Sequence, residues 1–184
     1  MKALLRHVQN ADLDRLLALY ARFEPKGEFQ GLPPLTPRQT AEWLRHVRDI
    51  GSAEFVIEVA RSIVGHSMLC PGPSKSEAEF AVFMRQDFRG LGLGKALTLG
   101  TLNYGCKQLQ LDRVWLSVQG SNPRALHLFE RVGFHSVKKT DPFAWELAME
   151  RPSHCVECKG ERCLVFGAAL PRTLEVTRRR SQAA

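Results

Sequence analysis

Apolar side chains recur along this chain at two distinct periods. Helical spacing and helix-start signals predict helices over residues 13–20, 36–50, 93–106 and 123–132. Runs of β-branched and aromatic residues predict strands over residues 2–8, 54–60, 62–69, 77–84, 114–119, 135–139 and 144–150. Consecutive strands pair most simply as an antiparallel meander, and the later strand–helix–strand units add parallel pairing. We therefore expect an α/β fold whose mixed, twisted, mostly antiparallel sheet carries helices on both faces.

The most informative junction lies between the strand 77–84 and the helix 93–106. Gly90, Gly92 and Gly94 form a tight turn there, and glycine allows backbone N–H groups to face a ligand. The start of a helix adds four unpaired N–H groups and the positive end of the helix dipole. This order of elements predicts an anion site that a pyrophosphate would fit.

Two common pyrophosphate motifs do not match this turn. A Walker loop needs a glycine where the chain has Arg89, and it needs Ser or Thr where the chain has Ala96. A dinucleotide fingerprint that begins at Gly90 would need its third glycine at Lys95. What remains is the pattern Arg89-x-x-Gly92-x-Gly94.

That pattern closely resembles the coenzyme A signature of the GNAT acetyltransferases, Gln/Arg-x-x-Gly-x-Gly/Ala. A helix that merely begins with glycines is the alternative for this motif taken alone. The segment Asn122–Phe134 is also very similar to a family motif, Asn-x-x-Ala-x-x-Leu-Tyr/Phe-x-x-x-Gly-Phe, and it follows in the family's order. The resemblance covers residues 1–150, so we expect a GNAT domain there and a separate basic, cysteine-containing tail over 151–184.

The resemblance implies acetyl-CoA as the acetyl donor. Backbone groups of Val82, Phe83 and Met84 would pair with the pantetheine arm, much as a strand edge captures a peptide. Side chains of Arg89 and Lys95 either add positive charge or extend into solvent. The backbone N–H groups expected to hold the pyrophosphate belong to Gly90, Leu91, Gly92, Leu93, Gly94, Lys95 and Ala96.

Asn122 has two candidate roles. It is similar to the family asparagine that contacts the cofactor arm. It also precedes Pro123, which makes it a natural N-cap of the following helix. One side chain rarely serves both roles, so the sequence leaves both open.

The acceptor amine must lose a proton before it attacks a thioester, since the pKa of free lysine is about 10.4. A nearby carboxylate would act as the general base. Glu77 and Glu79 are two residues apart on one strand and therefore share a face. Residues 78–82 resemble the strand of bacterial protein-lysine acetyltransferases that carries their base. Glu79 is thus the candidate base and Glu77 the reserve; the alternative is that both face solvent.

One position departs from the family pattern. Many GNAT enzymes carry a tyrosine where this chain has Phe129, and its hydroxyl protonates the departing thiolate. Phenylalanine cannot do so, but a thiolate leaves fairly well unaided because thiol pKa values are near 8.5. The sequence therefore assigns no general acid.

The acceptor is not identified by any motif. An amine-bearing small molecule and a protein lysine both fit, and docking is expected beside the loop 22–35, where Glu24 and Glu28 could attract a cation. Phe129 and the tail motivate an alternative from another class, a non-catalytic acyl-CoA-binding regulatory module. The oligomeric state stays open, with a homodimer among the options.

Composition narrows the class of protein. The 184 residues, 44% hydrophobic and 24% charged, fit one globular domain, and no apolar run reaches the length of a membrane span or a signal peptide, so the expected location is the cytoplasm. Of the net charge of +7, residues 151–184 supply +4, from seven Lys or Arg and three Asp or Glu. No interleaved basic and aromatic pattern indicates nucleic acid.

The tail holds a compact cysteine cluster. Cys155, Cys158 and Cys163 with His154 could surround zinc, but the cluster has no second knuckle at the spacing of a zinc finger. A redox pair and chemically inert cysteines are the other interpretations. We expect no metal.

Overall fold

The computed structural model of the chain describes residues 2–27, 32–139, 144–150 and 172–175. The described α-helices are α1 (Leu13–Ala21), α2 (Pro37–Asp49), α3 (Leu93–Lys107) and α4 (Pro123–Arg131), with short 3-10 turns at Asn10–Asp12 and Gln86–Phe88. The strands are β1 (Lys2–His7), β2 (Ala53–Val59), β3 (Ser62–Pro71), β4 (Glu77–Met84), β5 (Arg113–Gln119), β6 (His135–Lys139), β7 (Ala144–Glu150) and β8 (Arg172–Glu175). None of the described helices is long and apolar enough to cross a membrane.

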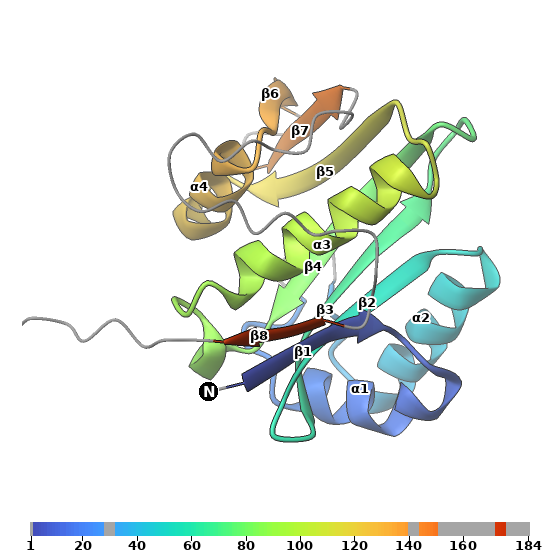
Figure 1. The fold of residues 1–184 in the computed structure, drawn as a ribbon, viewed down its shortest axis with the longest axis vertical. Coiled ribbons are helices and arrows are strands. Elements are labelled where there is room, and N and C mark those ends of the chain that lie inside the picture. The colour runs from blue at the N-terminus through green and yellow to red at the C-terminus, as the bar shows by residue number, and fades with distance from the viewer. Residues whose placement is uncertain (1, 28–31, 140–143, 151–171, 176–184) are drawn as a thin grey trace, which may run out of the picture.

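The strands form a single sheet in the order β6-β7-β5-β4-β3-β2-β1-β8 (Figure 1). β4 and β5 pair in parallel, because α3 connects them as a crossover, and the other neighbours pair antiparallel. The predicted mixed, mostly antiparallel sheet is confirmed. The expected closing hairpin, β6 with β7, is also present, whereas β8 lies in the tail and was not predicted.

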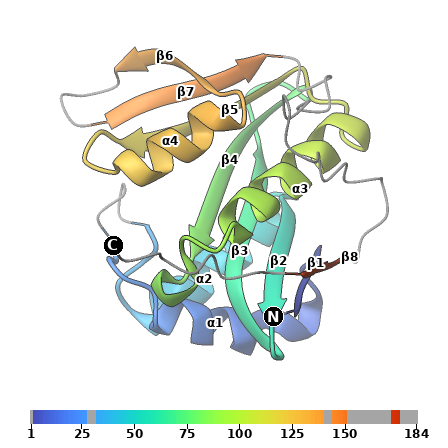
Figure 2. The same cartoon turned by 60° about the vertical axis from the view of Figure 1, so that its left-hand side comes forward.

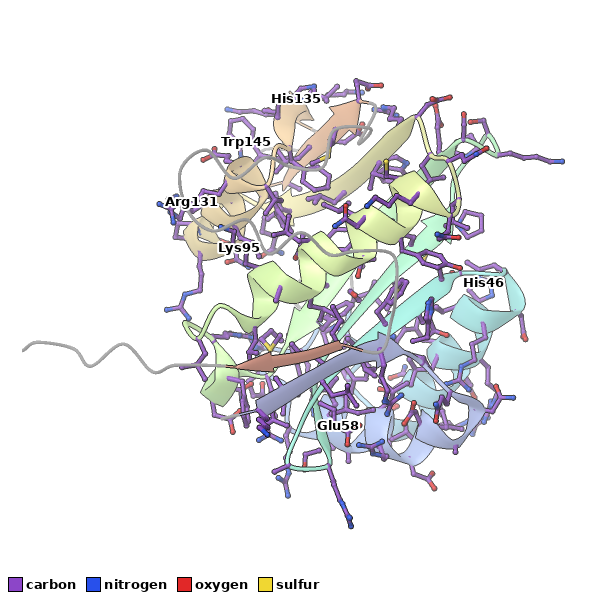
Figure 3. The ribbon with its side chains drawn as sticks, in the orientation of Figure 1. His46, Glu58, Lys95, Arg131, His135 and Trp145 are labelled. Atoms are coloured by element: carbon purple, nitrogen blue, oxygen red, sulfur yellow. The ribbon has the colours of Figure 1, made fainter. Side chains whose placement is uncertain are left out.

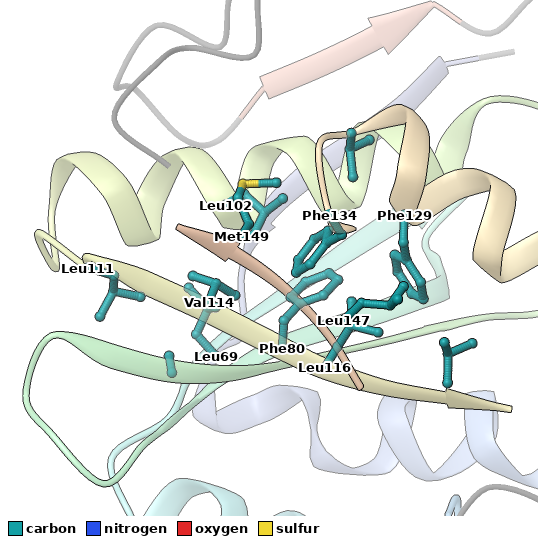
Figure 4. Close-up of a cluster of buried hydrophobic side chains, with 13 residues drawn as sticks. Leu69, Phe80, Leu102, Leu111, Val114, Leu116, Phe129, Phe134, Leu147 and Met149 are labelled. Atoms are coloured by element: carbon teal, nitrogen blue, oxygen red, sulfur yellow. The ribbon is translucent and has the colours of Figure 1, made fainter. Parts of the chain in front are cut away.

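Helices cover both faces of the sheet, as the hydrophobic pattern predicts (Figures 1 and 2). On one face α1 and α2 bury Leu16 and Leu44 against Met68 and Phe83 of the sheet. On the other face α3 buries Leu97 against the strands, and α4 joins a second apolar cluster (Figure 4). At about 25 cal/mol for each Å² of apolar surface removed from water, these clusters are the main stabilising contribution to the fold.

Local signals in the sequence set the start of α2. Thr36 Oγ1 accepts a hydrogen bond from the Gln39 N–H at 3.3 Å, and Pro37 occupies the first helical position. The Gln39 side chain reaches back toward the Thr36 N–H at 3.3 Å, which completes the predicted capping box. Gly51 follows the helix in a left-handed conformation with φ of +78°.

A buried ion-pair cluster joins β1, β2 and the start of α1. Asp12, only 2% exposed, accepts hydrogen bonds from Arg6 at 2.6 and 2.8 Å and from Arg15 at 3.0 Å. Glu58, labelled in Figure 3, contacts both arginines at 3.1 and 2.9 Å. The hydrogen bond from Arg6 is the main reason that the pKa of Asp12 falls from 3.8 to about 2. The folded state therefore favours the charged carboxylate.

Replacing Asp12 tests this cluster. Because the folded-state pKa lies below the unfolded one, the contribution is complete above about pH 4 and is lost as the pH falls toward about 2. We expect Asp12→Asn to lower the free energy of unfolding at pH 7 by about 2–4 kcal/mol. Urea denaturation from neutral to acid pH measures the deficit, which should shrink toward low pH. The exposed neighbour Asp14 provides the control Asp14→Asn; a deficit that is equal at all pH values would contradict the assignment.

Candidate functional site

The site is built around the point where β4 and β5 separate. Their parallel ladder has three residue pairs and ends where Glu79 lies beside Trp115. Beyond that pair β4 continues to Met84 alongside β3, and β5 continues to Gln119 alongside β7. The two strands therefore open a fork toward the glycine turn (Figure 2).

The inner edge of β4 presents backbone groups to this fork. The Arg85 N–H donates to the Val64 carbonyl at 2.9 Å, so the alternation of an antiparallel ladder directs the backbone of Phe83 toward β3. The backbone groups of Val82 and Met84 then point toward the side that β5 has left. Of the three residues expected to pair with a pantetheine arm, Val82 is placed to do so with both of its backbone groups. Met84 is placed to do so with its N–H, because its carbonyl accepts a hydrogen bond from Arg89 Nε. Phe83 is not, because its backbone faces β3.

The glycine turn holds a row of free amides. Gly90 and Gly92 both have φ of +78°, a left-handed conformation that glycine adopts without strain. Within the described parts of the chain, the backbone N–H groups of residues 90–95 have no acceptor. The Ala96 N–H differs, since it donates to the Gly92 carbonyl at 3.0 Å as the first hydrogen bond of α3. Ala96 therefore does not belong to the set of free amides expected at this turn, because its N–H is bonded within the first turn of α3.

Gly94 is not required by the packing of the protein. A Cβ atom added there would meet only the Leu128 side chain, at 4.0 Å, an ordinary contact distance. Gly100 in the same helix is different, because an added Cβ would lie 2.5 Å from the Leu5 side chain. The free space beside Gly94 lies at the start of α3, where an anion would approach the amides.

The Arg89 side chain is held by the protein and does not extend freely into solvent. Its Nε donates to the Met84 carbonyl at 2.9 Å, its Nη2 donates to the Glu24 carbonyl at 3.0 Å, and it stacks over the ring of Phe23. Burial and, secondarily, the charge of Arg124 lower its pKa. Arg89 therefore connects the loop after α1 to the end of β4, and it adds positive charge beside the turn.

Two further cations lie near the same turn. Lys95 is half-buried on the first turn of α3 and is labelled in Figure 3. Arg124 is on the first turn of α4, one turn before Leu128, which lies over Gly94. Sequence reasoning missed Arg124; its place between Asn122 and the apolar face of the helix was the available signal. The positive charge of both side chains favours an anion at the amides.

Asn122 acts as the cap of α4. Its Oδ1 accepts a hydrogen bond from the Ala125 N–H at 3.1 Å, as the asparagine–proline start predicts. The side-chain amide nitrogen is exposed at the end of the helix. Capping is thus the role that the described contacts show, and contact with a cofactor arm stays a prediction for that nitrogen.

Glu79 lies at the closed end of the fork, half-buried on the face that carries α1 and α2. Burial first, and the charge of Glu146 second, raise its pKa above 4.5. A raised pKa makes a carboxylate a stronger base. The position and the electrostatics both suit a general base. Glu77 shares the face but lies two residue pairs further from the opening, opposite Arg113.

A group of charged side chains lies at the closed end of the fork. Arg113 on β5 donates to Glu146 at 3.3 Å and to Glu150 at 3.1 Å, both on β7. With Glu77 and Glu79 on β4, these residues give four carboxylates and one guanidinium. Sequence reasoning missed Arg113 and Glu146, because only the registers of β4 with β5 and of β5 with β7 bring them near the carboxylates of β4. This acidic area contrasts with the overall net charge of +7.

No described aromatic hydroxyl is placed to act as the general acid in place of the family tyrosine. Phe129 is 7% exposed and packs against Phe80 and Phe134, with ring centroids 6.3 and 5.8 Å apart (Figure 4). On the opposite face, the Tyr20 hydroxyl is buried and lies 2.8 Å from His66 Nδ1. Burial raises the pKa of Tyr20 well above its ordinary value. Its proton is therefore retained and shared with His66.

Two predicted features fall partly or wholly outside the described residues. In the acceptor loop, Glu24 is described but Glu28 is not. Cys155, Cys158 and Cys163 also lie outside the described residues, so the expectation that they hold no metal stays a prediction. Among the residues that are described, no group of three or more His, Cys, Asp or Glu side chains could hold a metal ion.

Comparison with known proteins agrees with this geometry. The sequence profile described as "Acetyltransferase (GNAT) domain" matches residues 2–135. The chain is 29% identical over 132 residues to the spermidine N(1)-acetyltransferase of Vibrio cholerae, covering 71% of this chain and 72% of that protein. It is 26% identical over 131 residues to the Escherichia coli K12 enzyme of the same name, covering 71% and 67%. A solved chimera of the Vibrio cholerae enzyme superposes with a TM-score of 0.65 at 22% identity, covering 81% of this chain and 95% of that one.

The electrostatic coupling between Glu79 and Glu146 can be measured directly. We expect Glu146→Gln to lower the pKa of Glu79, because a neutral amide removes the neighbouring negative charge. The pKa should stay above its ordinary value, since burial is the larger cause. Carbon-detected NMR titration of glutamate side chains provides the measurement. Glu77→Gln is the matched control and should change the pKa of Glu79 less; an unchanged value in Glu146→Gln would refute the coupling.

Proposed function

The chain belongs to the GNAT acetyltransferase family and is an N-acetyltransferase that acts on an amine; on that premise we propose that it transfers acetyl from acetyl-CoA to a primary amine of a small polycationic molecule of the polyamine class. The observation that carries the proposal is the fork between β4 and β5, which leads from the free amides of residues 90–95 to the carboxylate of Glu79. One ligand lying along this path would place its diphosphate and its thioester at opposite ends.

The donor fits this path in three parts. The amides of residues 90–95 would bind the diphosphate, with Lys95, Arg89 and Arg124 supplying positive charge. The edge groups of Val82 and Met84 would pair with the amides of the pantetheine arm. The thioester would then lie near the closed end of the fork, beside Glu79. The Asn122 amide nitrogen is a further candidate donor to the arm.

The steps of the reaction follow from the groups at the closed end of the fork. The acceptor ammonium loses a proton to Glu79, directly or through water, and the neutral nitrogen attacks the thioester carbonyl carbon. The C–N bond forms, the C–S bond breaks, and the thiolate of CoA leaves. Phe129 cannot protonate the thiolate, which takes its proton from solvent or from the nitrogen. Glu79 then releases its proton to solvent.

The acceptor class rests on charge and on relatives. Glu77, Glu79, Glu146 and Glu150 make the area beside the fork acidic, although Arg113 offsets part of it. A molecule with several ammonium groups would be attracted there, while one amine enters the fork. The similar proteins from Vibrio cholerae and Escherichia coli are named for spermidine, a molecule of this class. A protein lysine is the competing acceptor.

Gly94→Glu tests the donor site. A glutamate in the first turn of α3 favours the helix dipole, so stability should be unchanged or slightly higher. The same charge would repel a diphosphate, and we expect acetyl-CoA affinity to fall about a hundredfold, roughly 2.7 kcal/mol. Isothermal titration calorimetry and thermal unfolding give the two readouts. Gly100→Ala is the opposite control: its Cβ would collide with Leu5, which should lower stability but spare affinity in the folded protein. Equal affinity in Gly94→Glu and wild type would reject the donor site.

Kinetics with a panel of acceptors tests the reaction and its substrate class. Spermidine, a monoamine of similar length and a lysine-containing peptide should be compared by release of free CoA thiol. We expect kcat/KM to be highest for spermidine and Glu79→Gln to lower it about 10²–10⁴-fold. In wild type the rate should rise as the pH increases through the raised pKa of Glu79. The Glu79→Gln variant should lack this rise in its pH–rate profile. A preference for the peptide would overturn the substrate class, and full activity of Glu79→Gln would overturn the base.

A further inference from the structure

The two edges of the sheet are protected in different ways. β6 forms one edge, and it is exposed along its length, carries Lys138 and Lys139, and has a register shift after Ser136. Charged side chains and irregular pairing are the usual means by which a natural edge strand avoids pairing with another molecule. This edge therefore needs no further cover.

At the opposite edge, β1 would readily pair with another strand if it were uncovered. β1 pairs with β2 over five consecutive residues without a register shift, and Ala3 and Leu5 are 1% and 0% exposed. A regular strand with an apolar centre presents a straight row of unpaired N–H and C=O groups on its outer side. β1 has one exposed lysine, Lys2 at its first residue, but it has no register shift and no pair of lysines.

In this structure β8 covers that edge. Its residues pair antiparallel with β1, from Lys2 beside Glu175 to Leu5 beside Arg172 (Figure 1). β8 lies outside residues 2–135, the part that matches the family profile. The cover is thus supplied by the C-terminal part of the chain and not by the matched acetyltransferase core.

The connection to β8 is long enough to come from the same chain. β7 and β8 are six strand positions apart in the sheet, about 29 Å at roughly 4.8 Å for each position. The roughly 20 residues between Glu150 and Arg172 can span about 70 Å when extended. The cover can therefore pair within one chain, and a short strand joined by a long connection loses little when it detaches.

We propose that the β1 edge is a surface for strand addition, which β8 occupies within the chain and which binds the β1 edge of a second copy when β8 is removed. A second copy is the natural occupant because β1 already takes antiparallel partners on both sides, and a twofold axis pairs two identical strands antiparallel. The C-terminal segment then controls assembly. The fork between β4 and β5 lies beyond β2 and β3, so catalysis in each chain is independent of this edge.

The test uses the full chain. Thr173→Pro combined with Leu174→Pro removes two backbone donors from β8 and prevents its pairing. The matched control, Thr177→Pro, has its substitution beyond the end of β8. Mass is measured by size-exclusion chromatography with light scattering, across a range of protein concentrations. We expect the double variant to have twice the mass of wild type at high concentration, and the control to match wild type.

Hydrogen exchange gives a second readout that does not depend on assembly alone. The β1 amides that face β8 should be protected in wild type, and at low concentration they should exchange faster in the double variant, whereas those that face β2 should not change. The amides that face β8 should become protected again as the variant associates. An unchanged mass in a folded double variant would overturn the proposal, and so would exchange in β1 that does not depend on β8.

Discussion

The separation of β4 and β5 is the constraint on which the rest of the structure depends. Each strand keeps an antiparallel partner beyond the point of separation, β4 with β3 and β5 with β7, over seven residue pairs apiece. The ladder between β4 and β5 joins the two half-sheets through three residue pairs. Because each half satisfies its own ladder, the strands can diverge without losing the pairing that stabilises them. The fork is therefore a stable feature of the fold and needs no ligand to hold it open.

The fork leaves backbone N–H and C=O groups without a hydrogen-bond partner in the described protein. On the inner edge of β4 the Met84 carbonyl is bonded by Arg89. The other groups of this edge and the amides of the glycine turn must be satisfied by water or by a ligand. Both sets lie along one path, which ends at a half-buried carboxylate. A ligand with a diphosphate at one end, amides in the middle and a reactive carbonyl at the other end matches them in order. The site is thus defined mainly by main-chain groups, and its side chains adjust charge and proton affinity.

The distribution of charge supports two different ligands at the two ends of this path. Lys95, Arg89 and Arg124 lie at the turn, whereas Glu79 and Glu146 lie at the closed end. A basic region for an anionic donor and an acidic region for a cationic acceptor are separated by the length of the fork. In the proposed reaction Phe129 would alter only the last step, since the departing thiolate would take its proton from elsewhere. Arg89 also has a structural task, because it holds the loop after α1 against the end of β4.

The sequence by itself determined the elements before the tail, the family and the glycine turn, because these depend on residues close together in the chain. The capping box at Thr36, the asparagine–proline start at Asn122 and the glycines of the turn all act through neighbours within a few positions. Only the tertiary structure decided which backbone groups are free: Ala96 is bonded within α3, and Phe83 faces β3. It also brought Arg113 and Glu146 beside Glu79 and placed β8 against β1. These relations depend on strand register between distant segments, and a shift of one residue would turn each side chain to the other face.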